Sequence, residues 1–262
     1  FHWFRNIIKS PTWYVQVVEE MKKMDKSICL LDAPSFFELL RIYLKENAPF
    51  AGGTGSREDP FLISTPQQFD NIRRYRSQCF QLVNDLDFSD YVREDGQSWW
   101  PLGEWGSGDK ALERFSGFFD GSGYSIRNLS VERKAHDLSI FGVTEGAEIV
   151  NLKVENCKII GEGRLGVLTG ATFSTKIEQV CVLNSQCENR LSDHGSNAGG
   201  LTGPLYRSVV KSCSIQGGNV YAKDCVGGIS SSMSKDSKII DCYSNCRIEG
   251  IINVGGMTGK VN

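Results

Sequence analysis

Asp85, Asp87 and Asp90 lie together in the short segment NDLDFSD, and their carboxylates are the kind of oxygen ligand that calcium binds. An EF-hand loop would add a glycine and a distal glutamate at fixed positions, and this segment has neither. Aspartates on surface strands and in turns give the same pattern. We therefore expect no metal site here, and we expect no cofactor.

Trp99, Trp100 and Trp105 form a denser aromatic group than the rest of the chain offers. Exposed indole rings make good stacking platforms for sugar rings, so these three residues are the candidate ligand-binding residues. The alternative is that they cover an apolar end of the core, which any stack of repeats must close off.

The chain has nine cysteines and three histidines. In an extracellular protein the cysteines could form disulfides. However, Cys213 and Cys242 occupy the same apolar position of a repeat that Leu152 and Val180 fill in earlier repeats, so we expect stacked free thiols that act as small buried apolar groups. The cysteine spacings contain no C-x-x-C pair and do not fit a zinc site.

The elements that would position these residues repeat from Phe115 onward. One pattern has the form apolar-x-x-apolar-x-apolar, and the other is a strand centred on one or two glycines. Their starts are separated by 23, 28, 33 and 29 residues and by 24, 34, 28 and 28 residues, respectively. The first begins at Ile126, Ile149, Ile177, Val210 and Ile239, and the second is anchored on Gly142, Gly166, Gly200, Gly228 and Gly256. Such spacing is typical of units that bury their apolar faces on one another.

The strand content of the units selects the kind of stack. Helical repeats would place apolar residues three and four apart over ten or more residues, and a propeller blade takes about 40–45 residues. These units instead have short period-2 segments separated by small and polar residues. We therefore predict a mainly β fold, a parallel β-helix or solenoid with an N-terminal cap. Near the strand ends, we expect left-handed backbone at Asn151, Asn156, Asn184 and Asn245.

The repeats resemble GLUG repeats, which are found in bacterial surface and secreted proteins. VGGMTG at 254–259, after IIDCYSNCRIEG at 239–250, is a good match, as is AGGLTG at 198–203. Upstream, GTGSREDPFLIST, LVNDLDFS, WWPLG and FSGFFDGSGYSIRNLSV are similar to the region that precedes such repeats. The resemblance covers residues 53–262. It implies a β-helix-like solenoid with a cap and an extracellular or cell-surface location, and it implies no reaction.

Four segments are expected along the chain. Residues 1–50 contain two amphipathic helical patterns around a short apolar strand and look like the C-terminal fragment of an upstream α/β domain. Residues 51–56 are a glycine-rich linker, residues 57–114 form the solenoid cap, and residues 115–262 carry the repeats, which we expect to continue beyond Asn262.

Within the cap, Thr65 precedes Pro66 and Gln68 as in a helix capping box. This pattern predicts a short helix from Pro66 to about Arg76, with Phe69 and Ile72 facing inward.

The first fifty residues also carry a second resemblance. The segments SPTWYVQVVEEMK and CLLDAPSFFELLRIYL are similar to the closing part of bacterial proteins classed as GxGYxYP glycoside hydrolases. The match covers about 40 residues and lacks the motif that names the family, so no catalytic residue is carried over. A generic αβα segment of another domain is the alternative.

Asp193, His194 and Gly195 resemble one short element of β-helix pectin hydrolases, whose chemistry needs several carboxylates and a basic residue. The other signatures of those enzymes are absent, and the tripeptide falls in the longest repeat interval, where a loop is expected. Asp193 and His194 are therefore weak catalytic candidates, and a solvated loop is the alternative.

The formal net charge of -2 gives no electrostatic sign of nucleic-acid binding, and no apolar run reaches the ~20 residues of a membrane-spanning helix. We expect a non-catalytic β-solenoid module of a secreted or cell-surface bacterial protein. It would act as a stalk, an adhesive or a carbohydrate-binding unit beside a possible upstream hydrolase domain, with a polysaccharide or cell-surface glycan as partner. The alternative function is that of a β-helix polysaccharide hydrolase or lyase, with converging carboxylates on one solenoid face.

Overall fold

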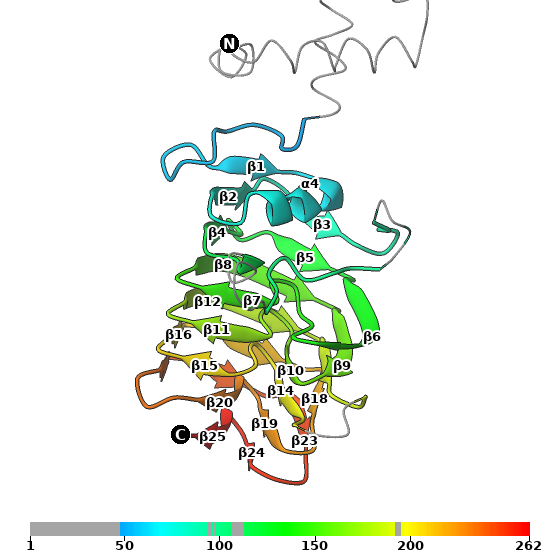
Figure 1. The fold of residues 1–262 in the computed structure, drawn as a ribbon, viewed down its shortest axis with the longest axis vertical. Coiled ribbons are helices and arrows are strands. Elements are labelled where there is room, and N and C mark those ends of the chain that lie inside the picture. The colour runs from blue at the N-terminus through cyan, green and yellow to red at the C-terminus, as the bar shows by residue number, and fades with distance from the viewer. Residues whose placement is uncertain (1–47, 94–95, 97, 106–112, 192–194) are drawn as a thin grey trace, which may run out of the picture.

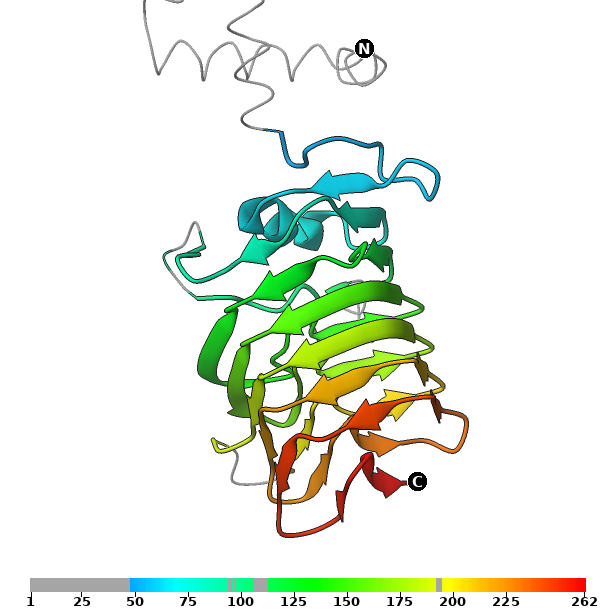
Figure 2. The ribbon, with the colours of Figure 1, turned by 180° about the vertical axis from the view of Figure 1, so that it is seen from behind.

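The structure, a computed structural model, describes residues 48–262 except 94–95, 97, 106–112 and 192–194. The strands stack one above another from the cap to the C-terminus, as Figures 1 and 2 show. The paired strands are parallel, so the predicted parallel β-solenoid is confirmed. The helices and strand expected in residues 1–47 lie outside the described residues.

From Glu148 onward, each coil of the solenoid contributes strands to four sheets, which the chain visits in a constant order, whereas the coils before it contribute to fewer sheets. We call these the long sheet and the second, third and fourth sheets. A coil runs, for example, from β8 (Glu148–Glu155) in the long sheet through β9 (Lys158–Glu162) and β10 (Arg164–Gly166) to β11 (Ala171–Phe173) in the fourth sheet. The next strand, β12 (Lys176–Leu183), then returns to the long sheet beside β8. Side chains of successive coils therefore stack in ladders.

The long sheet contains β1 (Phe61–Ile63), β2 (Cys79–Leu82), β3 (Leu86–Asp87), β4 (Phe118–Asp120), β5 (Ser125–Arg127), β8 (Glu148–Glu155), β12 (Lys176–Leu183), β16 (Val209–Lys211), β17 (Ser214–Gln216), β21 (Lys238–Ile240) and β22 (Tyr243–Ser244). The second sheet contains β6 (Ser130–His136), β9 (Lys158–Glu162), β13 (Gln186–Glu188), β18 (Asn219–Tyr221) and β23 (Arg247–Glu249). The third contains β10 (Arg164–Gly166), β14 (Asn197–Gly199), β19 (Cys225–Gly227) and β24 (Val254–Gly255). The fourth contains β7 (Val143–Glu145), β11 (Ala171–Phe173), β15 (Leu205–Tyr206), β20 (Ser230–Met233) and β25 (Thr258–Val261).

The apolar pattern of the long sheet forms one ladder through the core, and its first step corrects the predicted alignment. Ile149 pairs with Ile177, as the repeat pattern predicts. On the other side, however, Ile149 pairs with Phe119, whereas Ile126 pairs with Val154. Ile126 fits the apolar pattern, but it lies further along its coil than Phe119 and therefore pairs near the C-terminal end of β8. The complete ladder is Phe61, Phe80, Phe119, Ile149, Ile177, Val210 and Ile239.

The glycine-centred segments also align differently at two steps. Gly166 pairs with Gly199, so the predicted match of Gly166 to Gly200 is wrong by one residue. Val143, which follows Gly142, pairs with Ala171, so Gly142 is the counterpart of Gly170. Adjacent coils approach closely at these positions. A Cβ on Gly200 would lie 2.2 Å from the carbonyl oxygen of Gly228.

Left-handed residues mark the corners and the bend within the long sheet. Asn151, Asn156 and Asn184 have positive φ angles of 54°, 53° and 48°, as predicted, while Asn245 is not among the positive-φ residues. Gln179 takes the equivalent place to Asn151 in the next coil with a φ of 56°. Asparagine tolerates this conformation well, but Gln179 shows that the bend is a property of the position in the coil and does not require a short side chain.

The cap closes the N-terminal end of the core with a short helix. α4 (Pro66–Asn71) is followed by the 3-10 helix η2 (Ile72–Arg74), close to the predicted range. Thr65 is the N-cap residue and accepts a hydrogen bond from the backbone N–H of Gln68, as the capping pattern predicted. Phe69 and Ile72 are fully buried. The cap thus covers the aromatic end of the ladder.

The described cysteines are unpaired in this structure. Cys213 and Cys242 lie in the ladder position of Leu152 and Val180, as the repeats predict. Cys213 is 1% exposed, and its thiol donates to the carbonyl oxygen of Lys211 at 3.2 Å.

Candidate functional site

Trp99 does not belong to a binding surface. It is 2% exposed, and its indole N–H donates to the backbone carbonyl of Ser139 at 3.2 Å. Its ring packs 5.5 Å from the ring of Phe69 in the cap helix and 5.5 Å from that of Phe88. Trp99 therefore covers the apolar end of the core, which was the alternative to ligand binding.

Because Trp99 is buried, it anchors the segment that follows it. The backbone N–H of Leu102 donates to the carbonyl oxygen of Ile140, and that of Val143 donates to Gly103. A side chain at Gly103 would collide with the carbonyl oxygen of Val143, which explains the glycine. These bonds hold residues 99–105 against the chain that leads into β7.

Arg73 fixes the same segment from the cap. Its guanidinium donates to the carbonyl oxygens of Trp100 at 2.9 Å and Pro101 at 3.2 Å. The guanidinium is itself held by Asp70, one residue after Phe69 in α4. The cap and the first coils therefore position this segment together.

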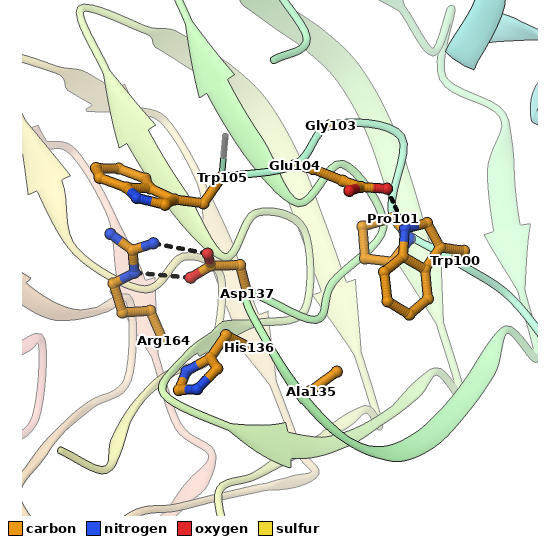
Figure 3. A pocket seen from close by; sticks show the side chains of 9 residues that line it. All are labelled: Trp100, Pro101, Gly103, Glu104, Trp105, Ala135, His136, Asp137 and Arg164. Atoms are coloured by element: carbon orange, nitrogen blue, oxygen red, sulfur yellow. Dashed lines mark hydrogen bonds and ion pairs between the residues drawn. The ribbon is translucent and has the colours of Figure 1, made fainter. Parts of the chain in front are cut away.

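A pocket of about 560 Å³ lies between this segment and the third sheet. Figure 3 shows Trp100 and Glu104 on one side, and Trp105 with Arg164 on the opposite side. The pocket is lined by Trp100, Pro101, Gly103, Glu104, Trp105, Ala135, His136, Asp137 and Arg164. The structure thus brings Trp100 and Trp105 together and leaves Trp99 outside.

Asp137 and Arg164 join two coils at the floor of the pocket. Nε of Arg164 donates to Oδ1 of Asp137 at 2.7 Å, and the second bond, to Oδ2, is 2.6 Å long (Figure 3). The Asp137 side chain is 7% exposed and that of Arg164 is 23% exposed. Asp137 directly follows β6 in a left-handed conformation, with φ of 58°, and Arg164 begins β10. This two-bond geometry is rigid and specific.

Trp105 lies above this ion pair. Its ring centroid is 4.2 Å from the guanidinium carbon of Arg164 and 4.9 Å from that of Arg114. The ring of Phe173 in β11 lies 5.5 Å away. Trp105 nevertheless remains 50% exposed. It therefore offers an apolar surface to a ligand from a position that cation–π contacts hold in place.

Trp100 forms the opposite wall of the pocket, and its indole N–H has a polar partner. Its indole N–H donates to the Glu104 carboxylate, and the guanidinium carbon of Arg133 lies 4.9 Å from its ring centroid. On the remaining side, His136 keeps 70% of its side chain exposed and lies 3.9 Å from Glu162. Aromatic walls with a few oriented polar groups are typical of small-molecule and sugar sites.

Two of the three aspartates of the segment NDLDFSD, Asp85 and Asp87, are bonded to the next coil, while Asp90 is exposed. Asp85 accepts from the backbone N–H of Ser125 at 2.8 Å and pairs with Arg127 at 3.0 Å. Asp87 accepts from both the backbone N–H and the hydroxyl of Ser89, and from the side chain of Asn128. Within the described ranges, no group of three or more histidine, cysteine or acidic residues is arranged to hold a metal ion. Asp193 and His194, the weak catalytic candidates, lie outside the described residues.

No protein-family model matches the sequence, so the GLUG resemblance remains a prediction. A "Putative Gly-rich membrane protein" of Evansella cellulosilytica is 34% identical over 144 residues, which are 52% of this chain and 16% of that protein. Halomucin of Haloquadratum walsbyi is 29% identical over 131 residues, which are 47% of this chain and 1% of halomucin. The chain therefore spans less than a fifth of either relative.

One solved structure is similar over most of the chain. It is described as a "putative immunoglobulin A1 protease from Bacteroides ovatus" and matches with a TM-score of 0.63, over 82% of this chain and 65% of that one, at 22% identity. At this identity the similarity shows the fold alone, which is mainly β with parallel sheets. No helix in the part of the chain that the structure describes is long and apolar enough to cross a membrane.

The tryptophan cluster in the sequence predicted two walls of the pocket, Trp100 and Trp105, but no pattern predicted the ion pair at its floor. Glu104, His136, Asp137 and Arg164 are single polar residues in unremarkable surroundings, and up to 60 positions separate them. Pairing of β6 with β9 brings His136 and Asp137 beside the chain that leads to Arg164, and the backbone bonds of Leu102 and Gly103 place Glu104 over them. The tryptophan cluster was the one signal in the sequence that pointed to this place.

Proposed function

We propose that this chain is a non-catalytic, carbohydrate-binding β-solenoid segment of a cell-surface or secreted protein, and that sugar binds in the pocket between Trp100 and Trp105. The single observation that carries the proposal is the half-exposed indole of Trp105 facing a pocket whose other groups are polar and oriented. Sugars present apolar C–H faces beside hydroxyl groups, so they match an aromatic wall next to hydrogen-bonding groups.

The polar groups of the pocket suit a neutral sugar. Asp137 and Arg164 neutralise each other, which leaves Glu104 as an acceptor and His136 as an exposed group that can donate or accept. A pocket of about 560 Å³ has room for one or two sugar rings. The rigid parallel stack behind it would hold the pocket in a fixed shape, so little ordering energy would be lost on binding.

The relatives support the proposed location. One is named as a Gly-rich membrane protein and the other is halomucin, and both names suit the surface of a cell. A stack of coils that extends by simple repetition would serve there as a spacer that carries a binding site away from its attachment.

A glycan array with three proteins tests the proposal. The wild type and Tyr243→Ala should bind the same glycans, because Tyr243 is 54% exposed in β22 of the long sheet, away from the pocket. Trp105→Ala should lose at least 90% of the signal. If the wild type binds no glycan, or if Trp105→Ala binds as well as Tyr243→Ala, the carbohydrate proposal is wrong. In the first case the stalk function is the one that remains.

The polysaccharide hydrolase or lyase alternative has one observation in its favour. Glu104, Asp137 and Arg164 come from different coils and line the same pocket. However, both oxygens of Asp137 are taken by Arg164, which leaves Glu104 as the one available carboxylate in the lining of the pocket, whereas hydrolysis of a glycosidic bond ordinarily takes two. Release of reducing ends from a bound polysaccharide, lost in Glu104→Gln, would establish catalysis. Binding without release would support the module.

A further inference from the structure

We propose that Cys213 and Cys242 are a covalent modification site: when the protein meets a small disulfide oxidant, the two residues form a disulfide that ties the coil of β16 and β17 to the coil of β21 and β22. This inference does not depend on the carbohydrate proposal. It rests on the register of the ladder, on the contact between the two thiols and on their unequal exposure.

The register places the two cysteines side by side. Ser214 pairs with Tyr243, so the residues that precede them, Cys213 and Cys242, face each other across adjacent coils. The backbone N–H of Tyr243 donates to the carbonyl oxygen of Cys213 at 3.0 Å and fixes this pairing. Neighbouring strands lie about 4.8 Å apart, and disulfides span Cα atoms about 4.4–6.8 Å apart.

Other described cysteines in the strands face different residues. Cys187 pairs with Ile159 and Val220, and Cys225 pairs with Asn197. Cys181 pairs with Lys153 and Ser214. Among the strand pairings that the structure describes, Cys213 and Cys242 are the two cysteines that share a ladder position.

The two thiols already interact, and each also points to the same kind of acceptor. The neighbouring Cys242 thiol raises the pKa of Cys213, which burial raises further, and the Cys213 thiol in turn lowers the pKa of Cys242. Each sulfur also lies 3.2 Å from the carbonyl oxygen two residues before it, at Lys211 and Ile240. The two side chains are therefore oriented alike along the ladder.

Exposure sets the order of the reaction. Cys242 is partly exposed, whereas Cys213 is 1% exposed. The Cys242 thiolate attacks one sulfur of oxidised glutathione and expels one glutathione thiolate. The Cys213 thiol then loses its proton to solvent as its sulfur attacks the Cys242 sulfur and expels the second glutathione thiolate. The protein loses two protons and two electrons, and oxidised glutathione is reduced to two thiols.

Peptide mapping of the 262-residue chain tests this proposal. The reduced protein is incubated with oxidised glutathione, alkylated and digested. We expect a cross-linked peptide pair containing Cys213 and Cys242, two fewer free thiols at these positions, and a rise of about 5 °C in the midpoint of thermal unfolding that dithiothreitol reverses. Free thiols at both positions, or a stable glutathione adduct on Cys242 beside an unreacted Cys213, would overturn it.

Three single variants separate the steps and provide the control. In Cys242→Ser, the buried Cys213 should stay a free thiol. In Cys213→Ser, Cys242 should accumulate as the mixed disulfide with glutathione. Cys181→Ser, which removes a partly buried thiol bonded to the Ser214 hydroxyl, should leave the cross-link unchanged. Loss of the cross-link in Cys181→Ser would contradict the assignment of the pair.

Discussion

The guanidinium of Arg164 lies 4.2 Å below the ring centroid of Trp105 while it makes two hydrogen bonds to Asp137. The Arg164 side chain therefore contacts the Trp105 wall of the pocket and also ties its own coil to the coil of Asp137. It connects Trp105 to the third sheet, and it does so where the Asp137 side chain is only 7% exposed. The shape of the pocket and the stability of the first coils are thus coupled.

Arg164→Met should destabilise the protein by about 2–3 kcal/mol, because it removes the partner of a buried carboxylate and leaves that charge unpaired. The midpoint of urea unfolding measures this loss. Arg247→Met is the matched control, since Arg247 is 77% exposed and pairs with the half-exposed Glu249. That change should stay within about 0.5 kcal/mol of wild type. Equal losses of unfolding free energy in the two variants would show that the Asp137–Arg164 pair contributes no more to stability than an exposed ion pair.

Gly200→Ala and Gly256→Ala should differ sharply although both glycines stand at the same place of their coils. A Cβ at Gly200 would lie 2.2 Å from the backbone oxygen of Gly228, whereas a Cβ at Gly256 would meet nothing within 4 Å. We expect Gly200→Ala to cost about 3 kcal/mol in unfolding free energy and Gly256→Ala to be nearly neutral. Circular dichroism during thermal unfolding would compare them. A neutral Gly200→Ala would contradict the close approach of the coils.

Asp87 should make the stability of the cap depend on acid pH. Hydrogen bonds from the Ser89 side chain and then from Asn128 lower the pKa of Asp87 from 3.8 to about 2. A carboxyl with a lowered pKa in the folded state stabilises the protein above pH 3.8, and this contribution is lost as the pH falls toward 2.

The urea midpoint of the wild type should therefore fall more steeply between pH 4 and pH 2 than that of Asp87→Asn. Ser89→Ala should give an intermediate slope, because it removes one of the donors and keeps the carboxylate. Identical slopes in wild type and Asp87→Asn would mean that the hydrogen bonds to Asp87 do not favour its ionised form.

The fold could be predicted from the sequence because its determinants repeat. Ile149, Ile177 and Val210 recur at intervals that only a stack of short strands accommodates, and Thr65 carries the local signal for the cap helix. The predicted pairing of Ile126 with Ile149 was wrong because Phe119 and Ile126 both fit an apolar strand. The local sequence does not say which of them pairs with Ile149. Pairing between coils decides that.

The site could be predicted only where its residues cluster in the chain. Trp100 and Trp105 stood out, but the sequence could not tell them from Trp99, whose burial depends on its packing against Phe69 in the cap. Asp137 and Arg164 carry no local signal, since their meeting follows from the register of β6 and β9. The residues that meet in the pocket are therefore determined by strand pairing between coils, which residue spacing in the sequence does not reveal.

The most direct test of the proposed function follows the tryptophan side chains during binding. The oligosaccharide selected by the array is titrated into ¹⁵N-labelled protein, and the indole N–H signals are observed by NMR. We predict that the signals of Trp100 and Trp105 shift with saturation while that of Trp99, whose indole N–H is bonded to Ser139, does not move. Binding that leaves the Trp100 and Trp105 signals unchanged would contradict the account.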